Sequence, residues 1–110
     1  MDAVFVQGGR SIDYTPDSNV AAGDVVVQGD LVGVATRAIE ANTLGALAVE
    51  GVFDFAKDTG SADAISAGAR LYWDESEALA TTESSGNVYL GKAVQAAAAD
   101  AATVRVRMSQ

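Results

Sequence analysis

The 110-residue sequence contains no cysteine and no histidine. These absences exclude disulfide bonds, thiolate nucleophiles, the commonest general base and the usual zinc ligands. Carboxylates, hydroxyls and lysines are what remains for catalysis. We therefore expect a protein that is not an enzyme, with no catalytic residue, no metal site and no cofactor.

Basic residues are also scarce, with 7 Lys and Arg against 15 Asp and Glu, for a net charge of -8. The basic residues are scattered between Arg10 and Arg107. Neutralising phosphates requires clustered Lys and Arg, so we expect neither a nucleic-acid partner nor an anionic membrane partner.

Long apolar runs are missing, and much of the 49% hydrophobic content is alanine. Alanine buries little apolar area, so the core is thin and a partner subunit would add stability. The N-terminus lacks the basic and apolar segments of an export signal, which predicts synthesis in a cytoplasm.

Short apolar stretches separated by Gly, Asp, Asn and Ser predict an all-β fold, with one domain over residues 1–110. A small barrel or a β-clip-like arrangement would suit such strands. Single strands are expected at 11–14, 70–74, 87–94 and 103–108. A hairpin is expected over 24–36, with its turn at 28–30, and a hairpin tip at 74–82.

The run 44–57 has the clearest period of two. Glu50 and Asp54 fall on one face, and the other face carries Leu47, Val49, Phe53 and Phe55. Gly51 marks a bulge or a close approach of backbones.

Residues 94–102 are rich in alanine and have high helix propensity. One short helix is a possible exception to the all-β pattern. A tightly packed strand and turn would use the same small residues, so both alternatives stay open.

Two parts of the chain resemble each other. Residues 22–27 resemble 67–72, and residues 32–35 resemble 90–93, provided that an insertion around 74–87 is assumed. This is a weak internal duplication, and it predicts a pseudo-symmetric arrangement of two halves.

The stretch 86–93, GNVYLGKA, partly matches the phosphate-binding pattern G-x-x-x-x-G-K-[ST]. Ala93 stands where a hydroxyl should bind magnesium, and strand-forming residues occupy the loop itself. Gly91 also corresponds to Gly33 in the duplication. We favour a strand, with nucleotide binding through Lys92 as the alternative.

Acidic residues gather at 74–83 and at Glu50 and Asp54. The spacing of the first group matches no calcium loop, so a solvated turn is favoured. Glu50 and Asp54 could supply paired carboxylates for glycoside chemistry, but a solvent-facing side of a strand is the favoured explanation, since no sugar-stacking aromatic surface is evident beyond Trp73 and Tyr72.

Tyr72 and Trp73 are adjacent, so in a strand one should lie in the core and the other should be partly exposed. Arg105 and Arg107 share one face of the last strand and could meet an acidic neighbouring subunit. We predict oligomer contacts at Trp73, Arg105 and Arg107. The alternatives are an ordinary solvent face or an intrachain pair with Glu50 or Asp54.

The N-terminal stretch 1–9 carries the apolar residues Val4, Phe5 and Val6, followed by Gln7 and two glycines. It could form a first strand of the domain, or extend as an arm that adds to a foreign sheet edge. In the second case Val4, Phe5, Val6 and Gln7 are the predicted contacts.

Taken in order, seven stretches across nearly the whole chain resemble one family of small phage and prophage proteins, the capsid cement or head decoration proteins. These stretches are VQGG, AAGDVVVQGDLVGVA, VEGVFDFAK, AISAG, LYWD, GNVYLGKAV and TVRVRM. Family members once carried the label of a predicted RecA/RadA-like phage recombinase, which the residues at 86–93 do not support.

The resemblance implies a β-rich structural protein that binds the outer face of a tailed-phage or prophage capsid, commonly as trimers, and stabilises it. Its partners would be the major capsid protein and two further copies of itself. It would be made in the bacterial host cytoplasm and located on the virion capsid surface. Two alternatives remain: a nucleotide-binding accessory of phage recombination, and a module that binds a small ligand or a glycan through Trp73 or Tyr72.

Overall fold

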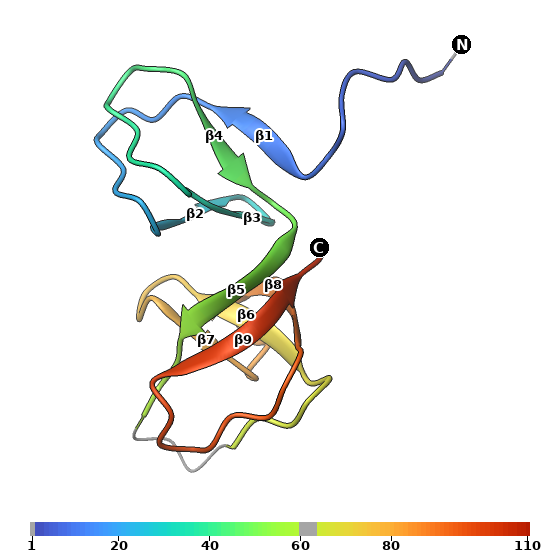
Figure 1. The fold of residues 1–110 in the computed structure, drawn as a ribbon, viewed down its shortest axis with the longest axis vertical. Coiled ribbons are helices and arrows are strands. Elements are labelled where there is room, and N and C mark those ends of the chain that lie inside the picture. The colour runs from blue at the N-terminus through green and yellow to red at the C-terminus, as the bar shows by residue number, and fades with distance from the viewer. Residues whose placement is uncertain (1, 60–63) are drawn as a thin grey trace.

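The protein is built from two groups of antiparallel strands, seen one above the other in Figure 1. The computed structural model describes residues 2–59 and 64–110. The described residues form strands and no helix, which confirms the all-β prediction. The strands are β1 Ser11–Tyr14, β2 Val25–Gln28, β3 Leu31–Val34, β4 Gly45–Ala48, β5 Gly51–Ala56, β6 Arg70–Asp74, β7 Leu79–Thr81, β8 Val88–Ala93 and β9 Thr103–Met108.

We call residues 11–48 the first unit and residues 51–108 the second unit. The first unit forms a four-stranded sheet in the order β1-β4-β3-β2, and the second forms a five-stranded sheet in the order β5-β9-β8-β6-β7. Of the two arrangements expected, the small barrel does not form, because within the described residues neither sheet closes. The edges β5 and β7 of the second sheet are linked only by an isolated bridge between Lys57 and Ala80.

The hairpin of β2 and β3 shows why local sequence predicted so many strands correctly. Gln28 pairs with Leu31, which leaves Gly29 and Asp30 as a two-residue turn. Gly29 has a φ of 60°, a conformation that glycine adopts without steric cost. A glycine at the first position of such a turn matches the right-handed twist of the flanking strands.

The apolar run at 44–57 is not one continuous strand. It bends at Glu50 and splits into β4 of the first sheet and β5 of the second. Leu47 consequently packs in the first unit, whereas Phe53 and Phe55 pack in the second, so the shared face predicted for them was wrong. A period of two describes each piece but does not reveal where a chain passes from one sheet to another.

The alanine-rich residues 94–102 form bends and turns with one isolated bridge at Ala97, so the short helix was wrong and the turn of the other alternative is present without a strand. Ala97 bridges to Ile65, and the ammonium of Lys57 takes the nearby carbonyl oxygens that a helix would use internally. Lys57 donates to the carbonyls of Asp58, Ala98, Ala99 and Ala101 at 2.9, 3.1, 2.9 and 3.2 Å.

The two units repeat one backbone arrangement. The order β1-β4-β3-β2 corresponds to β5-β9-β8-β6, and β7 lies within the predicted insertion at 74–87. Gly23 and Gly68 both have positive φ, at 91° and 84°. Three backbone hydrogen bonds of the first unit have counterparts in the second. In the first unit they join Val20 to Ile39, Gly23 to Ala35 and Ala35 to Asp24. Their counterparts, in the same order, join Ile65 to Ala97, Gly68 to Ala93 and Ala93 to Ala69.

Both units build their cores from equivalent positions. Corresponding core residues of the two units make the same strand pairings or backbone hydrogen bonds. The positions are Ile12, Tyr14, Val20, Val26, Ala35, Ile39 and Leu47 in the first unit, and Phe53, Phe55, Ile65, Leu71, Ala93, Ala97 and Val106 in the second. The internal duplication is therefore present in the packing as well as in the sequence.

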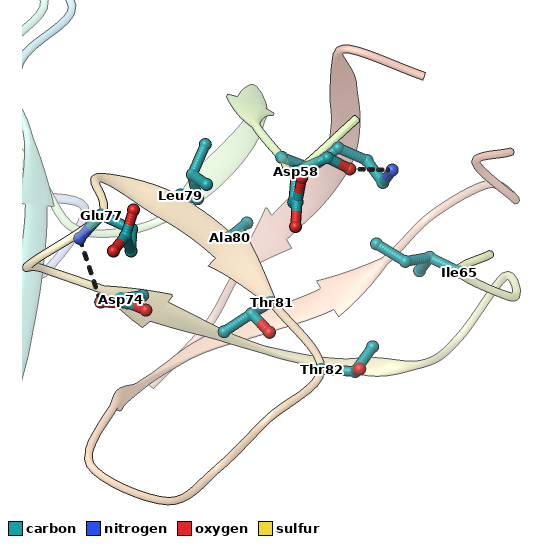
Figure 2. A pocket seen from close by; sticks show the side chains of 9 residues that line it. Asp58, Ile65, Asp74, Glu77, Leu79, Ala80, Thr81 and Thr82 are labelled. Carbon is teal, nitrogen blue, oxygen red and sulfur yellow. Dashed lines mark hydrogen bonds between the residues drawn. The ribbon is translucent and has the colours of Figure 1, made fainter. Parts of the chain in front are cut away.

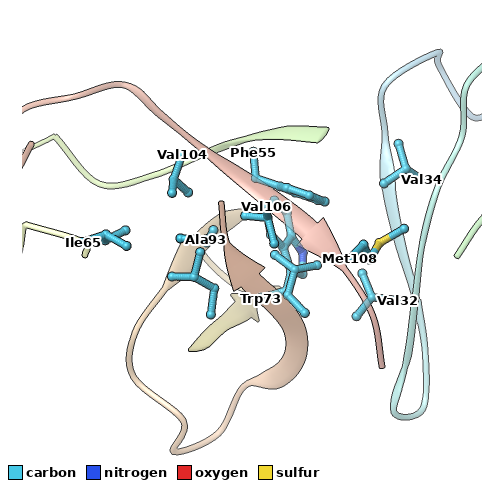
Figure 3. Close-up of a cluster of buried hydrophobic side chains, with 12 residues drawn as sticks. Val32, Val34, Phe55, Ile65, Trp73, Ala93, Val104, Val106 and Met108 are labelled. Atoms are coloured by element: carbon cyan, nitrogen blue, oxygen red, sulfur yellow. The ribbon is translucent and has the colours of Figure 1, made fainter. Parts of the chain in front are cut away.

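The first unit also packs its other face against the second. Val25 and Val27 contact the core cluster of the second unit, and Val32 and Val34 belong to it. Figure 3 shows Met108, from the end of β9, beside Val32 and Val34. The β2-β3 hairpin is thus covered on both faces, which explains its nearly continuous run of valines.

Candidate interaction surfaces

The N-terminal residues before β1 extend away from both sheets (Figure 1). Val4, Phe5 and Val6 are 73%, 86% and 84% exposed, and no described residue before Ser11 belongs to a strand. Gln7 makes only a long local contact, donating from Nε2 to the carbonyl of Ser11 at 3.4 Å. The structure therefore has an arm here and not a first strand of the domain.

Trp73 and Tyr72 lie on opposite faces of β6, as their adjacency predicted. Trp73 is the core member, 6% exposed, with its ring 5.9 Å from that of Phe55 in an edge-to-face arrangement. Tyr72 points outward, and its ring lies 5.7 Å from that of Tyr89. In this chain Trp73 therefore offers little surface to a neighbouring subunit, and Tyr72 is the more accessible of the two adjacent residues.

Arg105 and Arg107 point outward from β9, and they differ in their partners. Arg105 donates to Asp54 through Nε at 2.9 Å and through Nη2 at 3.2 Å. This hydrogen bond and the opposite charges lower the pKa of Asp54 and raise the pKa of Arg105. Arg107 lies across the sheet from Val52 on one side and from Lys92 on the other. The predicted intrachain pair thus exists for Arg105, while Arg107 remains available.

The same outward face carries Arg70 and Lys92, opposite each other on β6 and β8. With Tyr72 and Tyr89 they line a shallow groove. Lys92 was expected only as an alternative phosphate ligand, and no sequence pattern grouped these four residues. The alternation that turns Arg70 and Tyr72 outward on β6 was readable in the sequence, but Tyr89 and Lys92 share a face only because the β6-β8 pairing shifts register at a bulge.

The partial phosphate-binding motif does not form a phosphate loop. Residues 88–93 are strand β8, and Gly91 lies buried against β9. A Cβ at Gly91 would collide with the backbone carbonyl of Arg107, so the glycine is required by the sheet contact. Lys92 faces outward from the strand and does not point into a ring of backbone N-H groups.

A cavity of about 250 Å³ lies between the end of β5 and the β6-β7 hairpin (Figure 2). Its wall includes Lys57, Asp74 and Glu77, and the first two of these side chains already have hydrogen-bond partners. The Lys57 ammonium is bonded to carbonyls, and Asp74 accepts from the hydroxyl of Ser76 at 2.7 Å and from the backbone N-H of Glu77 at 3.2 Å. These bonds, above all that from Ser76, lower the pKa of Asp74. Asp74 therefore organises its own turn.

The acidic residues form no metal centre in the described part of the chain, where no group of three or more candidate ligands converges. Glu50 lies at the bend between the sheets, and Asp54 is occupied by Arg105. No helix among the described residues is long and apolar enough to span a membrane.

These observations define a small all-β protein in which two sheet units repeat one arrangement and the distinctive exposed features are an apolar arm and a basic, aromatic sheet face. A family model described as phage cement protein matches residues 6–108, so the chain belongs to the phage cement protein family. This membership confirms the resemblance and indicates a structural, phage capsid-associated role. Searches of curated proteins and of solved structures each found no match.

Proposed function

We propose that the protein binds the outer face of an expanded phage or prophage head and stabilises it, with the N-terminal arm as its main contact to the major capsid protein. The observation that carries this proposal is the arm itself, because three adjacent large apolar side chains stand almost fully exposed at residues 4–6. Clustered exposed apolar residues are typical of a binding site for another protein.

The energetics of the arm favour attachment by several copies. Burying Val4, Phe5 and Val6 contributes about 5 to 9 kcal/mol. Ordering the backbone of residues 4–7 costs about 4 to 8 kcal/mol. A single arm is therefore a weak ligand, and a trimer with three arms would bind far more tightly through effective concentration. This favours an oligomer on the head surface, and the homotrimer that the resemblance implies would meet the requirement.

The arm is tested by removing residues 1–9 and measuring cosedimentation with expanded heads. We expect head binding to be lost while the unfolding midpoint of the free protein stays within experimental error, because the arm makes almost no contact with the sheets. The double substitution V4S/F5S should have the same effect. The matched control is Val94→Ser, which removes an exposed valine that lies on the body of the protein.

Unchanged head binding after deletion of the arm would contradict its assigned role. Light scattering of the free protein, with and without ATP, addresses the oligomer and the nucleotide alternative together. We expect a trimeric mass that is indifferent to ATP. Binding of ATP that Lys92→Ala abolishes would favour the recombination alternative instead.

A further inference from the structure

Three basic side chains form a row across the outer face of the second sheet. Arg70 on β6 pairs in register with Lys92 on β8, and Lys92 pairs with Arg107 on β9. Val52 on β5 continues the row beyond Arg107 and is 55% exposed. We call Arg70, Lys92 and Arg107, with the adjacent Tyr72 and Tyr89, the cationic face.

This arrangement is unfavourable in the isolated chain. Like charges directly opposite each other on neighbouring strands repel. The sequence has 15 acidic residues, yet within residues 2–59 and 64–110 the salt bridge is that between Arg105 and Asp54, so no carboxylate neutralises the row. A partner that brings carboxylates to this face would remove the repulsion.

The aromatic residues of the face suit a contact with protein. Tyr72 and Tyr89 pack edge to face, and they line the shallow groove together with Arg70 and Lys92. Tyrosine and arginine are enriched in protein interfaces, where their large side chains bury area and form hydrogen bonds.

The duplication provides a second argument. Val25, Val27 and Val34 occupy in the first sheet the positions that Arg70, Tyr72 and Lys92 occupy in the second. In the first unit this face is covered, because those valines pack against the second unit. In the second unit the equivalent face is uncovered and has become basic. The face of the repeat that carries Val25, Val27 and Val34 in the first unit is therefore a docking face. The first unit already uses it within the chain, to pack against the second unit.

We propose that the cationic face of one protomer binds the acidic first unit of a second copy of this chain. The first unit together with the bend that follows it, residues 11–50, contains one arginine and six acidic residues, all six exposed. The contact is head to tail, and such contacts generate closed rings when the rotation permits. The inference rests on the proposed homotrimer and specifies which surfaces would join in it.

Zero-length cross-linking with a carbodiimide tests the contact directly, since it joins an amine to a carboxylate in contact with it. Lys92 is the exposed lysine, because Lys57 is buried and bonded to backbone carbonyls. An equal mixture of unlabelled and ¹⁵N-labelled protein, cross-linked free and on heads, distinguishes links between copies by mass spectrometry. We expect mixed-isotope links from Lys92 to acidic residues of 11–50.

The double reversal R70E/K92E should weaken self-association by about tenfold or more in sedimentation equilibrium. The control is R10E/R37E, which gives the same net charge but leaves the cationic face intact and adds acid near the proposed docking surface. Its self-association should be unchanged or tighter. Circular dichroism establishes that both variants are folded.

Absence of links between copies, both free and on heads, would overturn the inference, as would equal weakening by the two double reversals. Links from Lys92 to the capsid protein alone would mean that this face meets the shell, which overturns the contact between copies and leaves the proposed function intact. A face that binds an oligothymidine and gives no link between copies would mean a nucleic-acid partner. Failure of the wild-type protein to sediment with heads would instead refute the proposed function.

Discussion

The first and second units share a strand order and a set of equivalent core positions, yet they use the two faces of their sheets differently. In the first unit, β3 is buried on both faces, by its own core and by the second unit. In the second unit, larger residues such as Phe55 and Trp73 fill one face, and the opposite face is left basic and exposed. One repeated backbone can therefore serve as an internal packing element in one copy and as an external surface in the other.

The largest effect should come from the equivalent glycines Gly91 and Gly33. A Cβ at Gly91 meets the backbone of β9, whereas at Gly33 it meets the side chain of Leu47, 2.8 Å from its Cβ. We expect Gly91→Ala to lower the free energy of unfolding by about 3 to 5 kcal/mol. Gly33→Ala should cost less, about 1 to 3 kcal/mol, because its clash with the Leu47 Cβ is milder than the backbone collision at Gly91.

Urea denaturation of both variants measures this difference. An equal loss at the two positions would show that β8 and β9 can separate as readily as β3 can move away from Leu47. The close backbone contact would then not distinguish the units.

Lys57 should have the next largest effect. Its counterpart in the first unit is Pro16, which is also buried but carries no charge. Lys57→Met removes the ammonium that donates to the carbonyls of Ala98, Ala99 and Ala101. It should lower the free energy of unfolding by about 2 to 4 kcal/mol. Hydrogen exchange of 97–102 should become faster.

The matched control for Lys57 is Lys92→Met, which changes an exposed lysine of the same sheet. Its unfolding free energy should stay within about 0.5 kcal/mol of the wild type. If both lysines gave the same small effect, the loop at 98–101 would not depend on the Lys57 ammonium.

Gln110 joins the two units directly and tests how strongly they are coupled. Its Oε1 accepts from the N-H of Val32 at 2.6 Å, and its Nε2 donates to the carbonyl of Val32 at 2.5 Å. Gln110→Ala should lower the free energy of unfolding by about 1 to 2 kcal/mol, with faster exchange of the Val32 amide. The control Ser109→Ala keeps the backbone hydrogen bond to Leu90 and should change neither the free energy of unfolding nor the exchange of the Val32 amide.

The smallest effect concerns Asp54. It pairs with Arg105, whereas the equivalent residue of the first sheet, Asp13, lies opposite Ala46. The pKa of Asp54 is lowered below its ordinary value of 3.8 by the hydrogen bond from Arg105. Its contribution to stability is therefore complete above about pH 4 and is lost as the pH falls through the lower folded-state pKa.

The stability difference between the wild type and Asp54→Asn should accordingly be constant from pH 5 to 8 and shrink below pH 4. Equilibrium unfolding at each pH measures it. The control is the same Asp54→Asn substitution made in an Arg105→Gln background, which lacks the pair and should give a difference without this decline. A decline of the same size in both backgrounds would mean that the pair with Arg105 is not its cause.

Much of the secondary structure could be predicted because its causes are local. The strand 103–108 alternates Val and Met with Arg, and 70–74 was recognised from its large apolar residues and the polar residues that follow. The duplication was visible because equivalent turns need the same small residues, as at Gly23 and Gly68. The arm at 4–7 remained one of two alternatives, since an apolar stretch pairs or stays free according to what lies beside it.

Other features could not be predicted because they depend on contacts between distant residues. The pattern of β6 placed Tyr72 and Trp73 on opposite faces, but only packing against Phe55 decided that Trp73 is the core member. The burial of Lys57 depends on carbonyls about forty residues away in the chain. The cationic face depends on the register of three strands, which a one-residue shift would destroy.

The sequence by itself determined the all-β class, the duplicated hairpins, the acidic charge and the family, because periodicity, turn residues and composition act over a few residues and remain visible in one dimension. Tertiary structure decided where the run at 44–57 passes from one sheet to the other, which aromatic residue is buried and which basic residues stand side by side. Those outcomes follow from the pairing of distant strands, whose energy depends on neighbours that the local sequence does not specify.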